Sequence, residues 1–220
     1  VESSAKHPAT VQGPGCEPAI GGGRLVTILS VFNGKGGSGK STLAQVLGVE
    51  LGASWIDTDP QASTADWGAV RGDGRVHSAT AATAALKLVR QLQGHQVVDT
   101  AGALTEVSQA VLPVSDVIVI PTSGRENDLR AIGKTVGVIH KLGLGDRTLL
   151  VLTRVHPRQS VAQLQELLAP LGLPVCPHRL AERAVYDRAQ ITGQTAAEVE
   201  PGGPAAVESA AVAEWVLSHA

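Results

Sequence analysis

The chain has 220 residues and a formal net charge of −2 at pH 7, and 43% of its residues are hydrophobic but only 2% are aromatic. This length fits one α/β domain, and the composition indicates a core of Val, Leu, Ile and Ala. The charge argues against a globally basic nucleic-acid-binding protein, so any nucleic-acid contact would need a local basic patch. The two cysteines, Cys16 and Cys176, form no C-x-x-C pair, which argues against a disulfide framework and a cysteine metal site.

Residues 1–24 are rich in Gly, Pro and Ser without hydrophobic periodicity, which predicts a disordered leader before one domain over residues 25–220. In that domain, strand-like apolar runs alternate with Ala- and Leu-rich helical segments. Strands are predicted at 25–32, 53–57, 96–99, 116–121, 147–154 and 174–176. Helices are predicted at 40–51, 63–70, 79–92, 104–112, 126–142, 160–171, 181–193 and 204–219, with an exposed Gly/Arg stretch at 71–75. This alternation predicts a three-layer α/β fold, in which helices flank a mainly parallel, twisted sheet.

A glycine-rich loop separates the first predicted strand from the first predicted helix. Its residues match the pattern G-x-x-x-x-G-K-[ST] and read Gly34-Lys35-Gly36-Gly37-Ser38-Gly39-Lys40-Ser41. Glycines let successive backbone N–H groups surround a phosphate, and the N-terminus of the following helix attracts the same anion. We expect Lys40 to reach the β- and γ-phosphates of ATP, Ser41 to bind Mg²⁺, and Thr42 to belong to the same site. A chance match is the alternative, but the strand before the loop and the helix after it favour a P-loop NTPase.

Three aspartates support this prediction because each follows a predicted strand. Asp57 and Asp59 end the second strand, and Asp99 ends the third. Ligands of open α/β sheets bind at the carboxyl ends of the strands, so we expect all three near the phosphate loop. Asp99 is placed as the Mg²⁺-binding aspartate. The alternative for each aspartate alone is an ordinary turn residue.

A second lysine in the loop is part of a resemblance to a known protein family. Lys35 precedes Gly36-Gly37, and the chain continues with Trp55-Ile56-Asp57-Thr58-Asp59-Pro60-Gln61 and Val97-Val98-Asp99-Thr100-Ala101-Gly102. These segments resemble the deviant Walker A family of ParA/MinD ATPases over residues 25–218. The resemblance is greatest to small plasmid-partition ParA proteins, including the ParF type, with less specific support from 121–123, 152–154 and 183–186.

The resemblance implies a homodimer that closes on ATP, with Lys35 crossing to the partner's nucleotide. A second cation in the loop would also help to spread the charge of the transferred phosphoryl group. The resemblance further implies that Asp59 orients the attacking water, that Asp57 supports the metal shell and that Gly102 offers a backbone N–H to the γ-phosphate. Two further residues, Thr153 and Arg154, lie where the family contacts or frames the adenine. A ParB-like centromere-binding protein would stimulate hydrolysis, and the dimer would bind DNA without sequence preference on the nucleoid.

Three arginines are candidates for that DNA contact. Arg179, Arg183 and Arg188 follow one another at short spacings near one predicted helix, so they could reach DNA phosphates. The alternative is a solvated, ion-paired helix face, with Glu182 and Asp187 nearby.

Other members of the wider fold are less consistent with the sequence. Residues 205–220 contain no Lys or Arg, so we expect this helix to pack on the domain rather than to bind a membrane. No apolar run reaches the length of a membrane span and no signal core begins the chain, which predicts a cytoplasmic protein. An ATP-dependent ligase of the dethiobiotin synthetase or cobyrinate amidase kind remains the alternative from another class, and a nucleotide-gated filament is a third.

Overall fold

The structure is a computed structural model that describes residues 27–220, without the side chains of Glu126, Asn127 and Leu129. The predicted leader and the first two residues of the first predicted strand lie outside the described residues.

A seven-stranded, all-parallel sheet forms the middle layer of the described chain, in the order β3-β2-β4-β1-β5-β6-β7. A helix connects each strand to the next strand in the chain, as the predicted alternation requires. The register pairs Asp57 with Asp99 and Val31 with Asp99, so the ends of β2, β4 and β1 meet at one edge. The strands are β1 (Ile28–Val31), β2 (Ser54–Asp57), β3 (Val76–Ser78), β4 (Gln96–Asp99), β5 (Val117–Thr122), β6 (Thr148–Val155) and β7 (Val175–Ala181).

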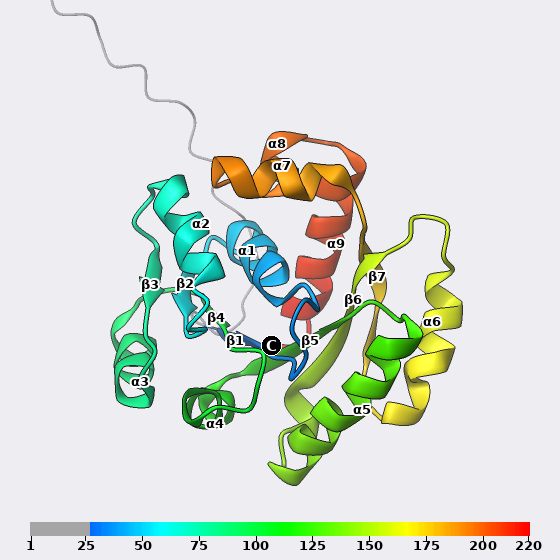
Figure 1. The fold of residues 1–220 in the computed structure, drawn as a ribbon, viewed down its shortest axis with the longest axis horizontal. Coiled ribbons are helices and arrows are strands. Elements are labelled where there is room, and N and C mark those ends of the chain that lie inside the picture. The colour runs from blue at the N-terminus through cyan, green and yellow to red at the C-terminus, as the bar shows by residue number, and fades with distance from the viewer. Residues whose placement is uncertain (1–26) are drawn as a thin grey trace, which may run out of the picture.

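Helices cover both faces of the sheet, which confirms the predicted three-layer α/β fold (Figure 1). One face carries α1, α2 and α9, with α7 and α8 beyond them, and the other carries α3 to α6. The helices are α1 (Lys40–Glu50), α2 (Ser63–Arg71), α3 (Ala82–Gln91), α4 (Glu106–Val111), α5 (Glu126–Lys141), α6 (Val161–Leu168), α7 (Ala184–Thr192), α8 (Ala196–Val199) and α9 (Pro204–Leu217).

The core is largely aliphatic, as the composition predicts, and its largest buried side chain is Trp55. The Trp55 ring packs so closely on α1 that a Cβ at Gly48 would lie 2.1 Å from it. Its indole Nε1 donates to the Ala44 carbonyl at 2.8 Å. This close packing fixes α1, and with it the start of the helix that carries Lys40, against the end of the sheet where the aspartates gather.

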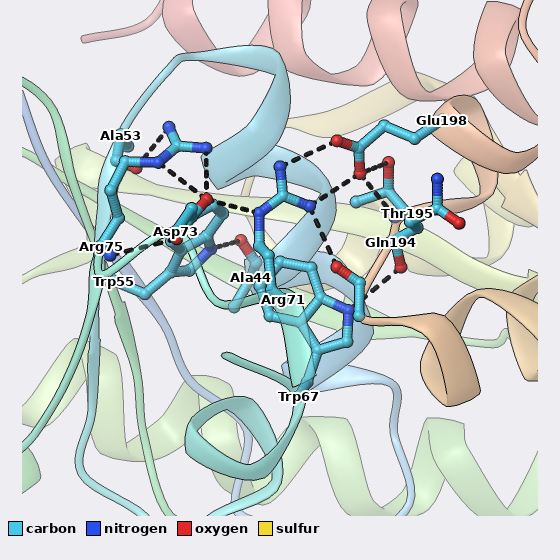
Figure 2. A network of polar contacts seen from close by, with 11 residues as sticks. Ala44, Ala53, Trp55, Trp67, Arg71, Asp73, Arg75, Gln194, Thr195 and Glu198 are labelled. Atoms are coloured by element: carbon cyan, nitrogen blue, oxygen red, sulfur yellow. Dashed lines mark hydrogen bonds and ion pairs between the residues drawn. The ribbon is translucent and has the colours of Figure 1, made fainter. Parts of the chain in front are cut away.

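The predicted exposed stretch at 71–75 is confirmed for Gly72, Asp73 and Gly74 but not for the two arginines at its ends. Arg71 is the last residue of α2, and its side chain is only 13% exposed. Figure 2 shows it between Trp67, Asp73 and Glu198, where it also donates to the Gly193 carbonyl at 3.1 Å. The surface pattern fails at Arg71 because its guanidinium pairs not only with the nearby Asp73 but also with Glu198, which lies far away in the sequence.

The C-terminal part of the sheet also differs from the prediction. Strand β7 extends from Val175 to Ala181, past the predicted end at 176, and α7 starts only at Ala184. Pro177 and polar neighbours hide the apolar pattern of this strand, which is tolerated because β7 is an edge strand. Strand β3 and helix α8 were not predicted at all, because both are too short to show a period.

Helix α9 packs on the domain, as predicted, with Ala205, Val212 and Val216 fully buried. It lies against β7 and α1. Among the described residues, no helix has the length and apolar character needed to cross a membrane.

Candidate nucleotide-binding site

The phosphate loop follows β1 and opens α1, as the motif predicts. Gly37 and Gly39 have φ angles of 71° and 86°, in the left-handed region that disfavours other residues. The loop carbonyls are held from β6, since Thr153 Oγ1 donates to the Ser38 carbonyl at 3.0 Å. Arg154 Nη1 donates to the Gly37 carbonyl, also at 3.0 Å. Thr153 and Arg154 therefore lie against this loop, while their contact with adenine stays a prediction.

The first residues of the loop are held by two side chains that the sequence reasoning missed. The Asn33 Oδ1 accepts from the Lys35 backbone N–H at 3.0 Å and from Thr135 Oγ1 at 3.1 Å. Thr135 in turn accepts from the Gly34 N–H at 3.2 Å, and Asn33 Nδ2 donates to the Pro121 carbonyl at 2.8 Å. No phosphate-loop pattern includes a residue on α5, so no signal in the sequence could have found Thr135.

Lys40, the first residue of α1, is buried with only 7% of its surface exposed. Burial lowers the pKa of its ammonium group, and the charges of Asp99 and Asp59 oppose this shift. Its Nζ donates to the Lys35 carbonyl at 3.3 Å. The segment after β4 comes close, because a Cβ at Gly102 would lie 3.5 Å from Lys40 Nζ and 3.6 Å from Gly36. The site thus brings a desolvated cation and the predicted Gly102 backbone together, as phosphate recognition requires.

Asp99 is the most buried acid of the site, with no exposed surface. Its Oδ2 accepts a 2.7 Å hydrogen bond from Thr64 Oγ1, whereas its Oδ1 is buried without a hydrogen-bond partner. Burial raises the pKa of this carboxyl to about 7, and the charge of Asp57 adds to the rise. The hydroxyls of Thr64 and Ser41 and the charge of Lys40 favour the charged form but do not outweigh burial.

Asp57 and Asp59 lie beside Asp99 but accept different hydrogen bonds. Both oxygens of Asp57 accept backbone N–H groups, from Asp59 at 2.9 Å and Ala65 at 2.8 Å. Burial nevertheless raises the pKa of Asp57. Asp59 is partly exposed, and its Oδ1 accepts from the Gln61 N–H at 3.0 Å. The three predicted aspartates therefore meet at one edge of the sheet, and Asp57 is held by the turn that follows it.

These residues fit a magnesium ion that is completed by substrate. Asp99 Oδ1 is an orphaned buried oxygen, and Ser41 provides a hydroxyl next to it. Among the described residues, no group of three or more His, Cys, Asp or Glu side chains could form a metal cage. Mg²⁺ suits such a place, because it keeps several waters and binds one or two protein groups together with phosphate oxygens.

Lys35 is placed differently from Lys40. Its side chain is 35% exposed and forms an ion pair with Asp128 of α5, which also accepts a hydrogen bond from Ser123. These side chains, with Gly37 and Arg154, line a cavity of about 330 Å³. Ser123 and Asp128 were not identified from the sequence as part of the site, although the segment 121–123 resembled the family.

The three candidate DNA-contacting arginines do not lie on one helix. Arg179 is in β7 and donates to the carbonyls of Gln159 at 2.5 Å and Pro157 at 2.6 Å. Arg183 precedes α7 and pairs with Glu208 at 2.7 Å, and Arg188 in α7 pairs with Glu200. The ion-paired alternative is thus present, but with glutamates other than the neighbouring Glu182. Contact with DNA stays a prediction.

The chain is similar to known nucleotide-binding proteins over most of its length. Residues 29–196 match the family model described as the CobQ/CobB/MinD/ParA nucleotide binding domain. The chain is 33% identical over 180 residues to the "Maintenance of carboxysome distribution protein A" of Gloeobacter kilaueensis. The matched region covers 76% of this chain and 82% of the relative.

The fold is also shared by solved structures, two of which illustrate the likeness. The septum site-determining protein MinD of Pyrococcus horikoshii, complexed with Mg-ADP, has a TM-score of 0.68 at 18% identity and covers 87% of this chain and 96% of that one. A putative plasmid partition protein of Borrelia burgdorferi bound to AMPPNP has a TM-score of 0.70 at 18% identity and covers 88% and 99%. At such identities, the likeness shows the fold alone.

Proposed function

The chain belongs to the family of CobQ/CobB/MinD/ParA nucleotide-binding domains, and we propose that it is a ParA-type ATPase that dimerises with ATP and positions a cargo on DNA. Its substrate is ATP, and its metal is Mg²⁺. When bound, Mg²⁺ neutralises charge on the phosphate oxygens. Asp99 and Ser41 hold the metal, with Asp57 fixing the turn beside it.

The other residues of the site bind and orient the substrate. The N–H groups of the loop and the ammonium of Lys40 surround the phosphates, and the Gly102 backbone approaches from the segment after β4. Asp59 is the least enclosed of the three aspartates, which suits a role in orienting the attacking water. Thr153 and Arg154 fix the loop beside the nucleotide.

The observation that carries the proposal is the contrast between two lysines of one loop. Lys40 is buried and serves the phosphate site of its own chain, whereas Lys35 is partly exposed and turned towards Asp128. A partly exposed cation at the rim of the site can reach a second protomer if it exchanges the Asp128 carboxylate for a phosphate. This supports a dimer that forms around ATP.

The cargo defines the finer function. In the plasmid or chromosome form of the proposal, a ParB-like protein bound to a centromere stimulates hydrolysis, and the dimer travels on nucleoid DNA in the cytoplasm. The Gloeobacter kilaueensis relative is named for maintaining carboxysome distribution, which supports a carboxysome as the other form of cargo. Both forms share the ATP-dependent dimer and the non-specific DNA contact.

The test is the molar mass measured by light scattering with ADP, ATP or a slowly hydrolysed ATP analogue, with and without duplex DNA of random sequence. We expect a dimer with ATP or the analogue only, and DNA binding by that dimer. Lys35→Ala should keep most nucleotide affinity but lose the dimer, whereas the exposed control Lys87→Ala should keep both.

The outcomes also separate the alternatives. A monomer under all nucleotide conditions would overturn the proposal and leave the biosynthetic ligase, to be followed by a screen of small-molecule acceptors. Larger ATP-dependent assemblies that pellet would indicate the filament. A Lys35→Ala dimer of normal stability would show that this lysine has no role across the interface.

A further inference from the structure

Thr64 is a buried hydroxyl that no phosphate-loop motif predicts. It is the second residue of α2, has no exposed surface, and donates from Oγ1 to Asp99 Oδ2 at 2.7 Å. A threonine near a helix start often caps that helix, but α2 has no side-chain cap. The single proton of this hydroxyl is therefore given to Asp99.

The hydrogen bond from Thr64 makes the two oxygens of the Asp99 carboxylate different from each other. Oδ2 is held by Thr64, whereas Oδ1 is equally buried and has no hydrogen-bond partner. A buried carboxylate oxygen without a partner is rare in folded proteins, and here it lies beside the Ser41 hydroxyl, where a bound cation would complete it. Because one oxygen is fixed, the carboxylate cannot rotate freely, and the other oxygen keeps one direction.

The start of α2 contacts two neighbouring strands through two carboxylates. The Ala65 N–H donates to Asp57 Oδ2 at 2.8 Å, next to the contact between Thr64 and Asp99. Asp57 and Asp99 are paired residues of β2 and β4. The first turn of α2 is thereby attached to the ends of both strands, and Ala62 just before it has a left-handed φ of 55°. Any change in the position of Asp99 acts directly on this turn.

We infer that Thr64 is a positioning residue, which binds one oxygen of Asp99 and thereby presents the other to the magnesium shell of the nucleotide. This inference rests on the proposed function of the site. Residues that orient a metal ligand through a hydrogen bond commonly contribute about 10- to 100-fold to metal affinity. A hydroxyl that only filled the core would contribute nothing to metal affinity beyond its effect on stability.

The test compares Thr64→Val, which keeps the shape but lacks the hydroxyl, with Thr64→Ser, which keeps the hydroxyl. Binding of a fluorescent ATP analogue is titrated with Mg²⁺, and nucleotide binding without Mg²⁺ is measured separately. For Thr64→Val, we expect the Mg²⁺ concentration at half-saturation to rise about tenfold or more, with Mg²⁺-free binding nearly unchanged. Thr64→Ser should recover most of the Mg²⁺ affinity.

Each contrary outcome has a distinct meaning. Equal Mg²⁺ affinity in folded Thr64→Val and wild-type protein would overturn the inference, and so would an equal loss in Thr64→Ser and Thr64→Val. If Thr64→Val does not fold, as judged by circular dichroism, Thr64→Ala replaces it against the same Thr64→Ser control. If the wild-type protein shows no Mg²⁺-dependent nucleotide binding, the proposed function fails rather than the role of Thr64.

Discussion

Two sets of charged side chains in this protein differ in how fully they are paired. At the carboxyl ends of β2 and β4, Asp99 is completely buried and leaves one oxygen without a partner. Around α7, by contrast, Arg183 and Arg188 each form an ion pair with a glutamate. A buried, unpaired acid costs stability unless a ligand completes it, whereas an exposed ion pair such as that of Arg188 and Glu200 contributes little and can exchange its partner.

The difference in pairing determines how each region would respond to a ligand. The phosphate site is prepared for a cation and a polyanion before either arrives, because Asp99 Oδ1 has no hydrogen-bond partner and the buried Lys40 ammonium donates only to a backbone carbonyl. The arginines near α7 must first give up carboxylates before they can hold DNA phosphates. Binding there is expected to be weaker and more sensitive to salt.

The largest expected effect concerns the prepared site. Lys40→Ala removes the buried cation and should lower ATP turnover by at least about 100-fold, since one charge-stabilising donor commonly contributes that much. Phosphate release at saturating Mg²⁺ measures it. Lys87→Ala, on the exposed side of α3, should match the wild type. Near-normal turnover by the Lys40 variant would show that this loop does not serve catalysis.

The second effect compares two arginine–glutamate pairs of different burial. Arg71 is 13% exposed and pairs with Glu198, whereas Arg188 is 61% exposed and pairs with Glu200 (Figure 2 shows the first pair). Arg71→Ala should cost about 2 kcal/mol of unfolding free energy, because it strands a partly buried carboxylate and removes packing on Trp67. Arg188→Ala should cost less than about 0.5 kcal/mol. Urea unfolding measures both, and equal losses would contradict the role of burial.

The third effect is the pH dependence of Asp99. Its pKa of about 7 in the folded protein lies above the ordinary value of 3.8, so the folded state prefers the protonated form. Its contribution to the stability of the nucleotide-free protein is therefore full below about pH 4 and is lost as pH rises towards 7. The difference in unfolding free energy between wild type and Asp99→Asn should shift in this window.

The same titration should weaken metal binding in acid, because a proton then competes with Mg²⁺ for the carboxylate. Mg²⁺ affinity in the presence of nucleotide should fall up to about tenfold per pH unit below 7. A flat Mg²⁺ affinity between pH 5 and 7 would argue against Asp99 as a metal ligand.

The smallest expected effect concerns the paired arginines. If Arg183 and Arg188 exchange glutamate for phosphate, each substitution by Ala should weaken DNA binding of the ATP-bound protein and reduce the slope of log affinity against log salt by about 1. Fluorescence anisotropy of labelled random duplex DNA measures this. Arg90→Ala, on the opposite layer, is the matched control. Unchanged slopes would place the DNA contact elsewhere.

The sequence by itself determined the phosphate loop, the three aspartates and the layered α/β fold. It could do so because these features follow local rules. Glycines permit the left-handed turns at Gly37 and Gly39, and parallel strands bring their carboxyl ends to one edge, so Asp57 and Asp99 become neighbours. The alternation of apolar strands and Ala-rich helices then leaves few other architectures.

Only the tertiary structure decided which side chains complete these features. Thr64 reaches Asp99 from α2, Thr135 holds the phosphate loop from α5, and Asp128 takes the side chain of Lys35. Arg71, expected on the surface, is enclosed by Glu198 from another helix. Each of these contacts joins residues far apart in the chain, so it depends on how helices pack on the sheet, and no short-range pattern records that packing.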